Sequence, residues 1–159
     1  MLNIGDKAPE IELPDQNGDT HKLSDLKGKY VFIYFYPKDD TPGCTLEACN
    51  LRDSYEKIAE LGVEVLGISP DSVKKHKKFE QKHELNFTLL ADEEKKTVTD
   101  YDVWKEKKFM GRAYMGVERT SLLINPEGKI AKVWEKVNPI GHVSNVVSVI
   151  PDLIGDPPK

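Results

Sequence analysis

Residues 30–36 read Tyr-Val-Phe-Ile-Tyr-Phe-Tyr, and this run from Tyr30 to Tyr36 is the longest dense apolar stretch in the 159-residue chain. It contains no alternating polar positions, which predicts a strand covered on both faces, as in the centre of an α/β sheet. Seven residues fall far short of the roughly 20 that are needed to cross a bilayer. The run therefore predicts a buried strand and not a membrane anchor.

Helices and strands are predicted to alternate after this run. Beyond a loop over residues 37–43, apolar residues recur at helical spacing as far as Leu61, and Gly62 ends the helix. A strand over residues 63–68 completes a βαβ unit, whose two strands should be parallel. The chain then predicts a charged surface helix over 72–84, a strand over 87–90, a short helix over 93–101 and a long surface loop over 105–116.

Two antiparallel hairpins are predicted from their turn sequences. Asn17-Gly18 separates short apolar pieces near the N-terminus, and residues 125–128, Asn-Pro-Glu-Gly, separate strands over 119–124 and 129–134. A last helix is predicted over 143–154, where Pro151 should kink or shorten it. The fold class is therefore α/β, with a mixed central sheet, helices on both faces and an N-terminal hairpin, in a single domain over residues 1–159.

Composition narrows the classes of function and location. Charged residues make up 31% and hydrophobic residues 38% of the chain, which is typical of a soluble globular protein. The formal net charge of −4 argues against a nucleic-acid partner, because phosphate binding leaves a basic footprint. Residues 1–6 have neither a basic start nor an apolar segment of the kind that directs secretion. We therefore expect a cytoplasmic protein without membrane or nucleic-acid partners, whose two cysteines are free or catalytic.

The first of these cysteines, Cys44, lies where the loop after the central strand becomes a helix. Thr41 suits the N-cap position and Pro42 suits the first helical position, where its missing N–H has no consequence. Reaction sites of open α/β sheets gather at the C-terminal ends of the strands. The unpaired N–H groups and the positive dipole end of a helix N-terminus also stabilise a thiolate. The position predicts a nucleophilic cysteine.

Nearby carboxylates act against a thiolate at this position. Asp39, Asp40 and Glu47 all lie close in sequence, and like charges disfavour a second anion. A cation must offset them if the thiolate is to form near neutral pH. Lys38 is too close in sequence to judge, so the residues around Cys44 do not by themselves identify this cation.

Four other interpretations of the cysteines are weaker. A lone cysteine is most often a small buried hydrophobe, but Cys44 follows Thr-Pro-Gly and lies outside an apolar stripe. The spacing from Cys44 to Cys49 suits zinc, yet two further ligands are required, and the four histidines are better explained as solvated or core residues. A thioredoxin-type C-x-x-C motif is absent, and nothing nominates the base of a Cys–His hydrolase.

The same residues resemble a known family. The pattern Pro37-x-x-x-Thr41-x-x-Cys44 is similar to the active-site motif of peroxiredoxins. The longer pattern over residues 42–47, with Cys49 five residues after Cys44, resembles the bacterioferritin comigratory protein subfamily. The resemblance extends from Gly5-Asp6-Lys7-Ala8-Pro9 to the turn over residues 125–128, and the chain departs from the family at Pro151 and in the tail over residues 155–159.

The resemblance implies a thioredoxin-like fold and an atypical 2-Cys thiol peroxidase that needs no cofactor or metal. Cys44 would be the peroxidatic cysteine and Cys49 the resolving cysteine, joined in an intramolecular disulfide. Thr41 would contact the hydroperoxide, Pro37 would shield the pocket, and Arg119 would be the active-site arginine. The implied reductant is thioredoxin or a similar dithiol, and we expect a monomer or at most a weak dimer.

A redox sensor or holdase, oxidised once without turnover, would use the same two cysteines. Thr41 and Arg119 favour the enzyme, because they add a catalytic geometry that a sensor does not require.

Overall fold

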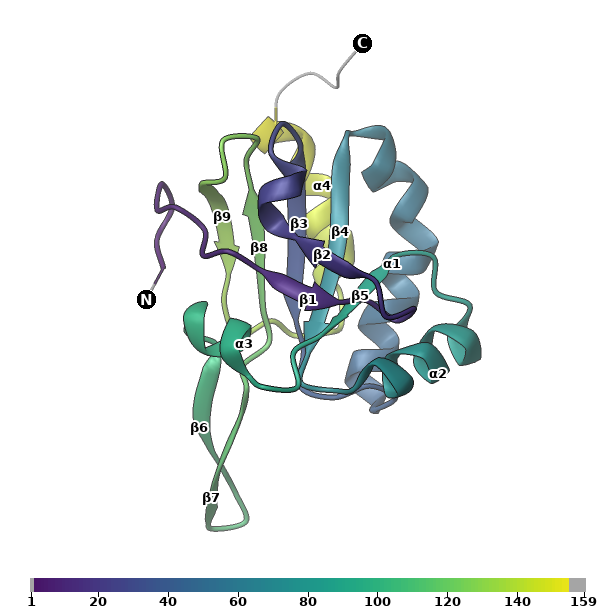
Figure 1. Ribbon diagram of the computed structural model, residues 1–159, viewed down its shortest axis with the longest axis vertical. Coiled ribbons are helices and arrows are strands. Elements are labelled where there is room, and N and C mark those ends of the chain that lie inside the picture. Colours follow the sequence, from purple (N-terminus) through teal and green to yellow (C-terminus); the bar gives the residue numbers. More distant parts are fainter. Residues whose placement is uncertain (1, 155–159) are drawn as a thin grey trace.

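The computed structural model describes residues 2–154, and at its centre lies a five-stranded sheet in the order β5-β4-β3-β8-β9 (Figure 1). The middle strand, β3 (Tyr30–Phe35), pairs in parallel with β4 (Val63–Ser69) and antiparallel with β8 (Thr120–Ile124). On the outer sides, β5 (Thr88–Ala91) pairs in parallel with β4, and β9 (Ile130–Trp134) pairs antiparallel with β8. The predicted mixed sheet, with the apolar run at its centre, is confirmed.

Both faces of this sheet are covered, as the lack of polar positions in β3 predicts. Phe32 and Tyr34 point into one apolar core, whereas Val31, Ile33 and Phe35 point into a second core on the opposite face. The first core is closed by α1 (Pro42–Glu60), α2 (Val73–His83) and α4 (His142–Ile154). The second is closed by the N-terminal hairpin of β1 (Glu12–Pro14) and β2 (Thr20–Lys22), the short helix η1 (Leu23–Leu26), and α3 (Lys96–Asp100) (Figure 1).

Helix α1 carries both cysteines and begins seven residues after the end of β3. Pro42 occupies the first helical position, and the helix ends at Glu60 before Gly62, whose φ of +78° is easily adopted only by glycine. The inner face of α1 packs on the sheet through residues such as Leu51 and Ile58, both fully buried. This packing holds the N-terminus of α1 at the C-terminal edge of β3.

The expected surface loop over residues 105–116 is wrong, because this segment forms a hairpin of β6 (Trp104–Phe109) and β7 (Arg112–Val117). The two strands meet at Met110 and Gly111, whose φ angles of +51° and +80° suit a tight two-residue turn. The hairpin projects beyond the body of the molecule (Figure 1). Most of its side chains therefore have no core to face, so the apolar and polar alternation by which a strand is recognised in sequence is missing.

Helix α4 covers the predicted segment with Pro151 inside it, so the proline does not shorten the helix. One proline removes a single helical hydrogen bond, and the buried side chains of Val143, Val146 and Ile150 hold the helix on the sheet. The departure noted after Pro151, residues 155–159, lies outside the described residues. None of the helices within residues 2–154 combines the length and the apolar character that a membrane crossing requires.

Candidate active site

Cys44 lies in the first turn of α1, with its side chain directed into the protein. The residue is 1% exposed, and its Sγ accepts a hydrogen bond from Nη2 of Arg119 at 3.1 Å. Cys49, one and a half turns further along the helix, is half-buried, and both cysteines are free thiols. The structure thus brings a guanidinium to the sulfur from a residue 75 positions away.

The loop before Cys44 places backbone donors next to the sulfur. Thr41 is the N-cap residue, and its carbonyl accepts from the amide of Thr45 at 2.8 Å. Its hydroxyl does not cap the helix as expected, because it donates instead to the carbonyl of Lys38 at 3.0 Å. The first-turn amides of Gly43 and Cys44 consequently have no side-chain cap, and such amides stabilise an anion in front of the helix. Pro37 is half-buried at the start of this loop.

A close approach between α1 and Arg119 depends on Gly43. A Cβ atom at Gly43 would lie 2.8 Å from Nη2 of Arg119 and 3.2 Å from Cγ of Pro139. The first distance is shorter than real Cβ contacts allow, so any larger residue would displace the guanidinium. The backbone of Arg119 is fixed just before β8, where its carbonyl accepts from the amide of Val137 at 2.8 Å.

Two of the three acids that were expected to oppose a thiolate are paired elsewhere. Asp40 is bound by Lys82 at 2.7 Å and His83 at 3.1 Å, and these hydrogen bonds lower the pKa of Asp40. Asp39 is buried and bound within a separate network. Glu47 is different, because burial raises its pKa to about 7 while Arg119 opposes that rise. Of these three acids, Glu47 is the one whose carboxyl group has no hydrogen-bond partner within residues 2–154.

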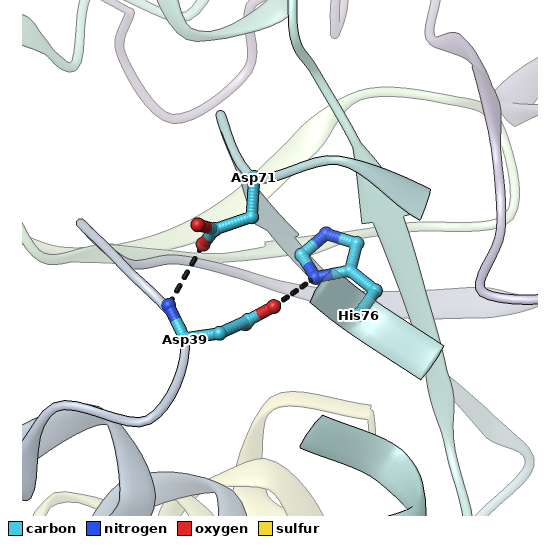
Figure 2. Close-up of side chains that lie close together, drawn as sticks. All are labelled: Asp39, Asp71 and His76. Carbon is cyan, nitrogen blue, oxygen red and sulfur yellow. Dashed lines mark hydrogen bonds and ion pairs between the residues drawn. The ribbon is translucent and has the colours of Figure 1, made fainter. Parts of the chain in front are cut away.

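The separate network joins Asp39 to α2 and includes a potential metal-binding set of Asp39, Asp71 and His76, all buried (Figure 2). Nδ1 of His76 lies 2.6 Å from Oδ2 of Asp39, and its Nε2 lies 2.9 Å from the carbonyl of Leu90. The backbone amide of Asp39 donates to Oδ2 of Asp71 at 2.7 Å. Since a carbonyl only accepts, Nε2 of His76 carries a hydrogen.

The other oxygen of Asp39 accepts from the Tyr36 hydroxyl at 2.5 Å. Burial, helped by Tyr34 and Asp39, raises the pKa of Tyr36 well above its ordinary value, so the phenol keeps the proton that it donates. Hydrogen bonds thus account for the ligand atoms of this set within the protein. The network anchors the loop before Cys44 to α2.

Lys107 is a neighbour of the site that the sequence did not suggest. It extends from β6, donates to the Val117 carbonyl, and is near enough to Cys44 and Arg119 for their charges to affect it. Burial, followed by the positive charge of Arg119, lowers the pKa of Lys107. No signal in the sequence could have identified this residue, because the hairpin that carries it was not predicted.

The sequence of the chain matches one protein family over most of its length. Residues 4–133 match the AhpC/TSA family. The chain belongs to that family. It is 52% identical over 152 residues to peroxiredoxin Bcp of Bacillus subtilis (strain 168), covering 96% of this chain and 97% of that protein. It is 47% identical over 141 residues to peroxiredoxin Bcp of Escherichia coli (strain K12), covering 89% of this chain and 90% of that protein.

Solved structures agree with these relatives. The bacterioferritin comigratory protein of Xanthomonas campestris, described in terms of its alkyl peroxide reduction activity, is 32% identical with a TM-score of 0.89, covering 97% of this chain and 98% of that one. A cysteine-to-serine mutant of PrxQ from Xylella fastidiosa is 31% identical with a TM-score of 0.91, covering 96% and 97%. The predicted thioredoxin-like fold and peroxiredoxin membership are confirmed, and the chain is a thiol peroxidase of the Bcp type.

Proposed function

We propose that Cys44 is the residue that attacks the peroxide, and that Cys49 then closes an intramolecular disulfide with it. The observation that carries this assignment is the 3.1 Å hydrogen bond from Arg119 to the Cys44 sulfur at the N-terminus of α1. A guanidinium and a helix N-terminus both favour the thiolate, which is the nucleophilic form of cysteine. Within residues 2–154 no side chain donates a hydrogen bond to the Cys49 sulfur, although Arg52 lies close enough for the two charges to interact.

The oxidation step transfers one oxygen from the peroxide to sulfur. The Cys44 thiolate attacks the hydrogen-bearing oxygen of the hydroperoxide, the O–O bond breaks, and Cys44 becomes a sulfenic acid while the other oxygen leaves and is protonated to an alcohol or water. In this proposal Arg119 and the first-turn amides donate to the reacting oxygens, where negative charge develops. The Thr41 hydroxyl oxygen accepts a hydrogen bond from the peroxide O–H, because its own hydrogen is donated to the Lys38 carbonyl. Pro37 shields the pocket.

The disulfide step requires α1 to change shape. Five residues of helix rise about 7.5 Å and turn through about 500°, which puts the Cα atoms of Cys44 and Cys49 about 8.7 Å apart. A disulfide rarely tolerates more than about 7 Å. Both cysteines lie within the continuous helix α1, as expected for the reduced state, so we propose that its first turns unwind after Cys44 is oxidised. Loss of amide-exchange protection over Thr45 to Arg52 in the oxidised form would support the unwinding, and equal protection in both forms would oppose it.

We further propose hydrogen peroxide and organic hydroperoxides as substrates, and thioredoxin or a similar dithiol as the reductant. Exposed apolar residues favour organic substrates: Leu46, two residues after Cys44 in α1, is 39% exposed, and Ile140, next to the proline that faces Gly43, is 76% exposed. The two free thiols suit a reducing compartment such as the cytoplasm. We expect one domain that acts as a monomer or a weak dimer.

A turnover assay tests the proposed function. NADPH consumption is followed with thioredoxin, thioredoxin reductase and excess peroxide. We expect many equivalents of peroxide to be consumed per protein, and Cys44→Ser to abolish this, because a serine hydroxyl is hardly ionised at neutral pH. Cys49→Ser should retain the first oxidation and lose thioredoxin-dependent turnover. Consumption that stops near one equivalent would instead indicate a redox sensor.

A further inference from the structure

Glu47 is a buried acid for which the reaction described so far has no use. It shares the inner face of α1 with Cys44, Ala48 and Leu51, and it is 1% exposed. Neither carboxyl oxygen has a hydrogen-bond partner among residues 2–154. Side chains three residues apart on a helix are neighbours, with Cβ atoms about 5–6 Å apart. The sequence thus places an unpaired acid next to the reactive sulfur.

The polar groups closest to Glu47 give its carboxyl group no hydrogen bond. Nη1 of Arg119, the Tyr34 hydroxyl and the Thr120 hydroxyl are also buried without a hydrogen-bond partner in the described part of the chain, and none of them bonds to the carboxyl group. Burial, with smaller effects from Glu47, Asp39 and Cys44, raises the pKa of Tyr34 well above its ordinary value, so this phenol stays neutral.

One buried guanidinium therefore faces two acids, the thiol of Cys44 and the carboxyl of Glu47, with Lys107 at the edge of the site. A single cation can balance one negative charge, and burial disfavours a second. Burial raises the pKa of Glu47 to about 7, within the range where it can gain or lose a proton under physiological conditions. Glu47 and Cys44 therefore compete for the same countercharge, the Arg119 guanidinium.

We propose that Cys44 and Glu47 share one proton, and that Glu47 holds it while Cys44 reacts as the thiolate. This proposal rests on the peroxidatic role of Cys44. When the sulfur attacks a hydroperoxide, the S–O bond forms, the O–O bond breaks, sulfur is oxidised and the leaving oxygen is reduced to an alkoxide. The alkoxide takes the proton from Glu47 and leaves as the alcohol. After the disulfide has been reduced, the Glu47 carboxylate takes the proton of the regenerated Cys44 thiol, which restores the starting state.

No direct hydrogen bond joins Glu47 to Cys44, so the proton reaches the leaving oxygen after a rotation of the Glu47 side chain or through one water molecule. Glu47 thus differs from Arg119, which contacts the sulfur itself.

The test compares two oxidants whose leaving groups differ in their need for a proton. tert-Butyl hydroperoxide releases an alkoxide, which must be protonated, whereas peracetic acid releases acetate, which need not be. Single-turnover loss of the Cys44 thiol is measured in Cys49→Ser protein with and without Glu47→Gln. We expect Glu47→Gln to slow the reaction with tert-butyl hydroperoxide about 100-fold relative to that with peracetic acid. Glu56→Gln, on the exposed side of the same helix, is the matched control and should leave the ratio unchanged.

An unchanged ratio of the two rates in Glu47→Gln would overturn the proposal, whether both rates fell together or neither fell. Infrared spectroscopy offers a second measurement that does not depend on this variant being active. The C=O band of the protonated Glu47 carboxyl should persist to higher pH in the wild-type protein than in Cys44→Ser, because the thiolate keeps the acid protonated. Loss of this band at the same pH in both proteins would also overturn the proposal that Cys44 and Glu47 share a proton. Peroxide reduction that survives in Cys44→Ser would instead refute the proposed function itself.

Discussion

Replacing Glu47 with Gln should make the protein more stable at alkaline pH, although it is expected to impair the reaction. Burial raises the pKa of Glu47 from its ordinary 4.5 to about 7. Between these values the unfolded chain has lost the proton that the folded protein still holds, so wild-type stability falls as the pH rises through this window. A tenfold change in proton affinity is worth about 1.4 kcal/mol, which gives a full effect of about 3.4 kcal/mol above the folded-state pKa. Since Glu47 is 1% exposed, solvent screening reduces this figure little.

The assay is chemical denaturation of wild type and Glu47→Gln at about pH 5 and about pH 8.5, under reducing conditions. The buried amide of Gln also lacks a partner, but that cost is the same at both pH values and cancels in the comparison. The difference in unfolding free energy between variant and wild type should rise by about 2.5 kcal/mol from the lower to the higher pH. The exposed control, Glu56→Gln, should show no such rise. A flat difference for Glu47→Gln would refute the inference that this acid is held protonated by burial.

Three other substitutions test contacts of the loop and helix around the site. Gly43→Ala should slow Cys44 oxidation at least about tenfold in single-turnover kinetics, because the new Cβ, 2.8 Å from Nη2 of Arg119, would displace the guanidinium. An unchanged rate would refute the need for glycine at this position. Thr41→Val should lower peroxide turnover but reduce the unfolding free energy by less than about 1 kcal/mol, because the Thr41 hydroxyl does not cap the helix. Thr41→Ser keeps the hydroxyl and should retain turnover. Full activity of the valine variant would contradict the assigned role. His76→Asn should lower the unfolding free energy by about 3 kcal/mol, because it leaves Asp39 buried with one partner fewer. The control His83→Asn, beside the exposed Asp40, should lower it by less than about 1 kcal/mol. Equal losses would argue against the buried network.

Much of the fold could be predicted because the local signals agree with the tertiary structure. The run from Tyr30 to Tyr36 predicts a strand buried on both faces, and β3 has a separate core on each side. The turn at residues 125–128 predicts the hairpin of β8 and β9. The hairpin of β6 and β7 was not predicted, because its strands are mostly exposed and lack an alternating apolar pattern. Backbone pairing and a two-residue turn define this hairpin instead.

The need for a cation beside Cys44 could be predicted from charge alone, because a thiolate near several carboxylates requires one. Only the family resemblance pointed to Arg119, whose guanidinium donates to the Cys44 sulfur. The burial of Glu47 could have been inferred, because it falls three residues after Cys44 and four before Leu51, on the stripe that faces the core. The direction of the Thr41 hydroxyl could not have been inferred. Two competing hydrogen bonds, one with the helix amides and one with the loop carbonyl, are equally compatible with the sequence.

The assignment of the two cysteines is tested most directly by trapping the first oxidation product. Reduced Cys44→Ser and Cys49→Ser proteins are each mixed with one equivalent of peroxide in the presence of dimedone, which labels sulfenic acids, and the labelled residue is mapped by mass spectrometry. We predict rapid labelling of Cys44 in the Cys49→Ser protein, and only slow background labelling of Cys49 in the Cys44→Ser protein. Rapid labelling of Cys49 in the absence of the Cys44 thiol, or none of Cys44 in the absence of the Cys49 thiol, would contradict the account.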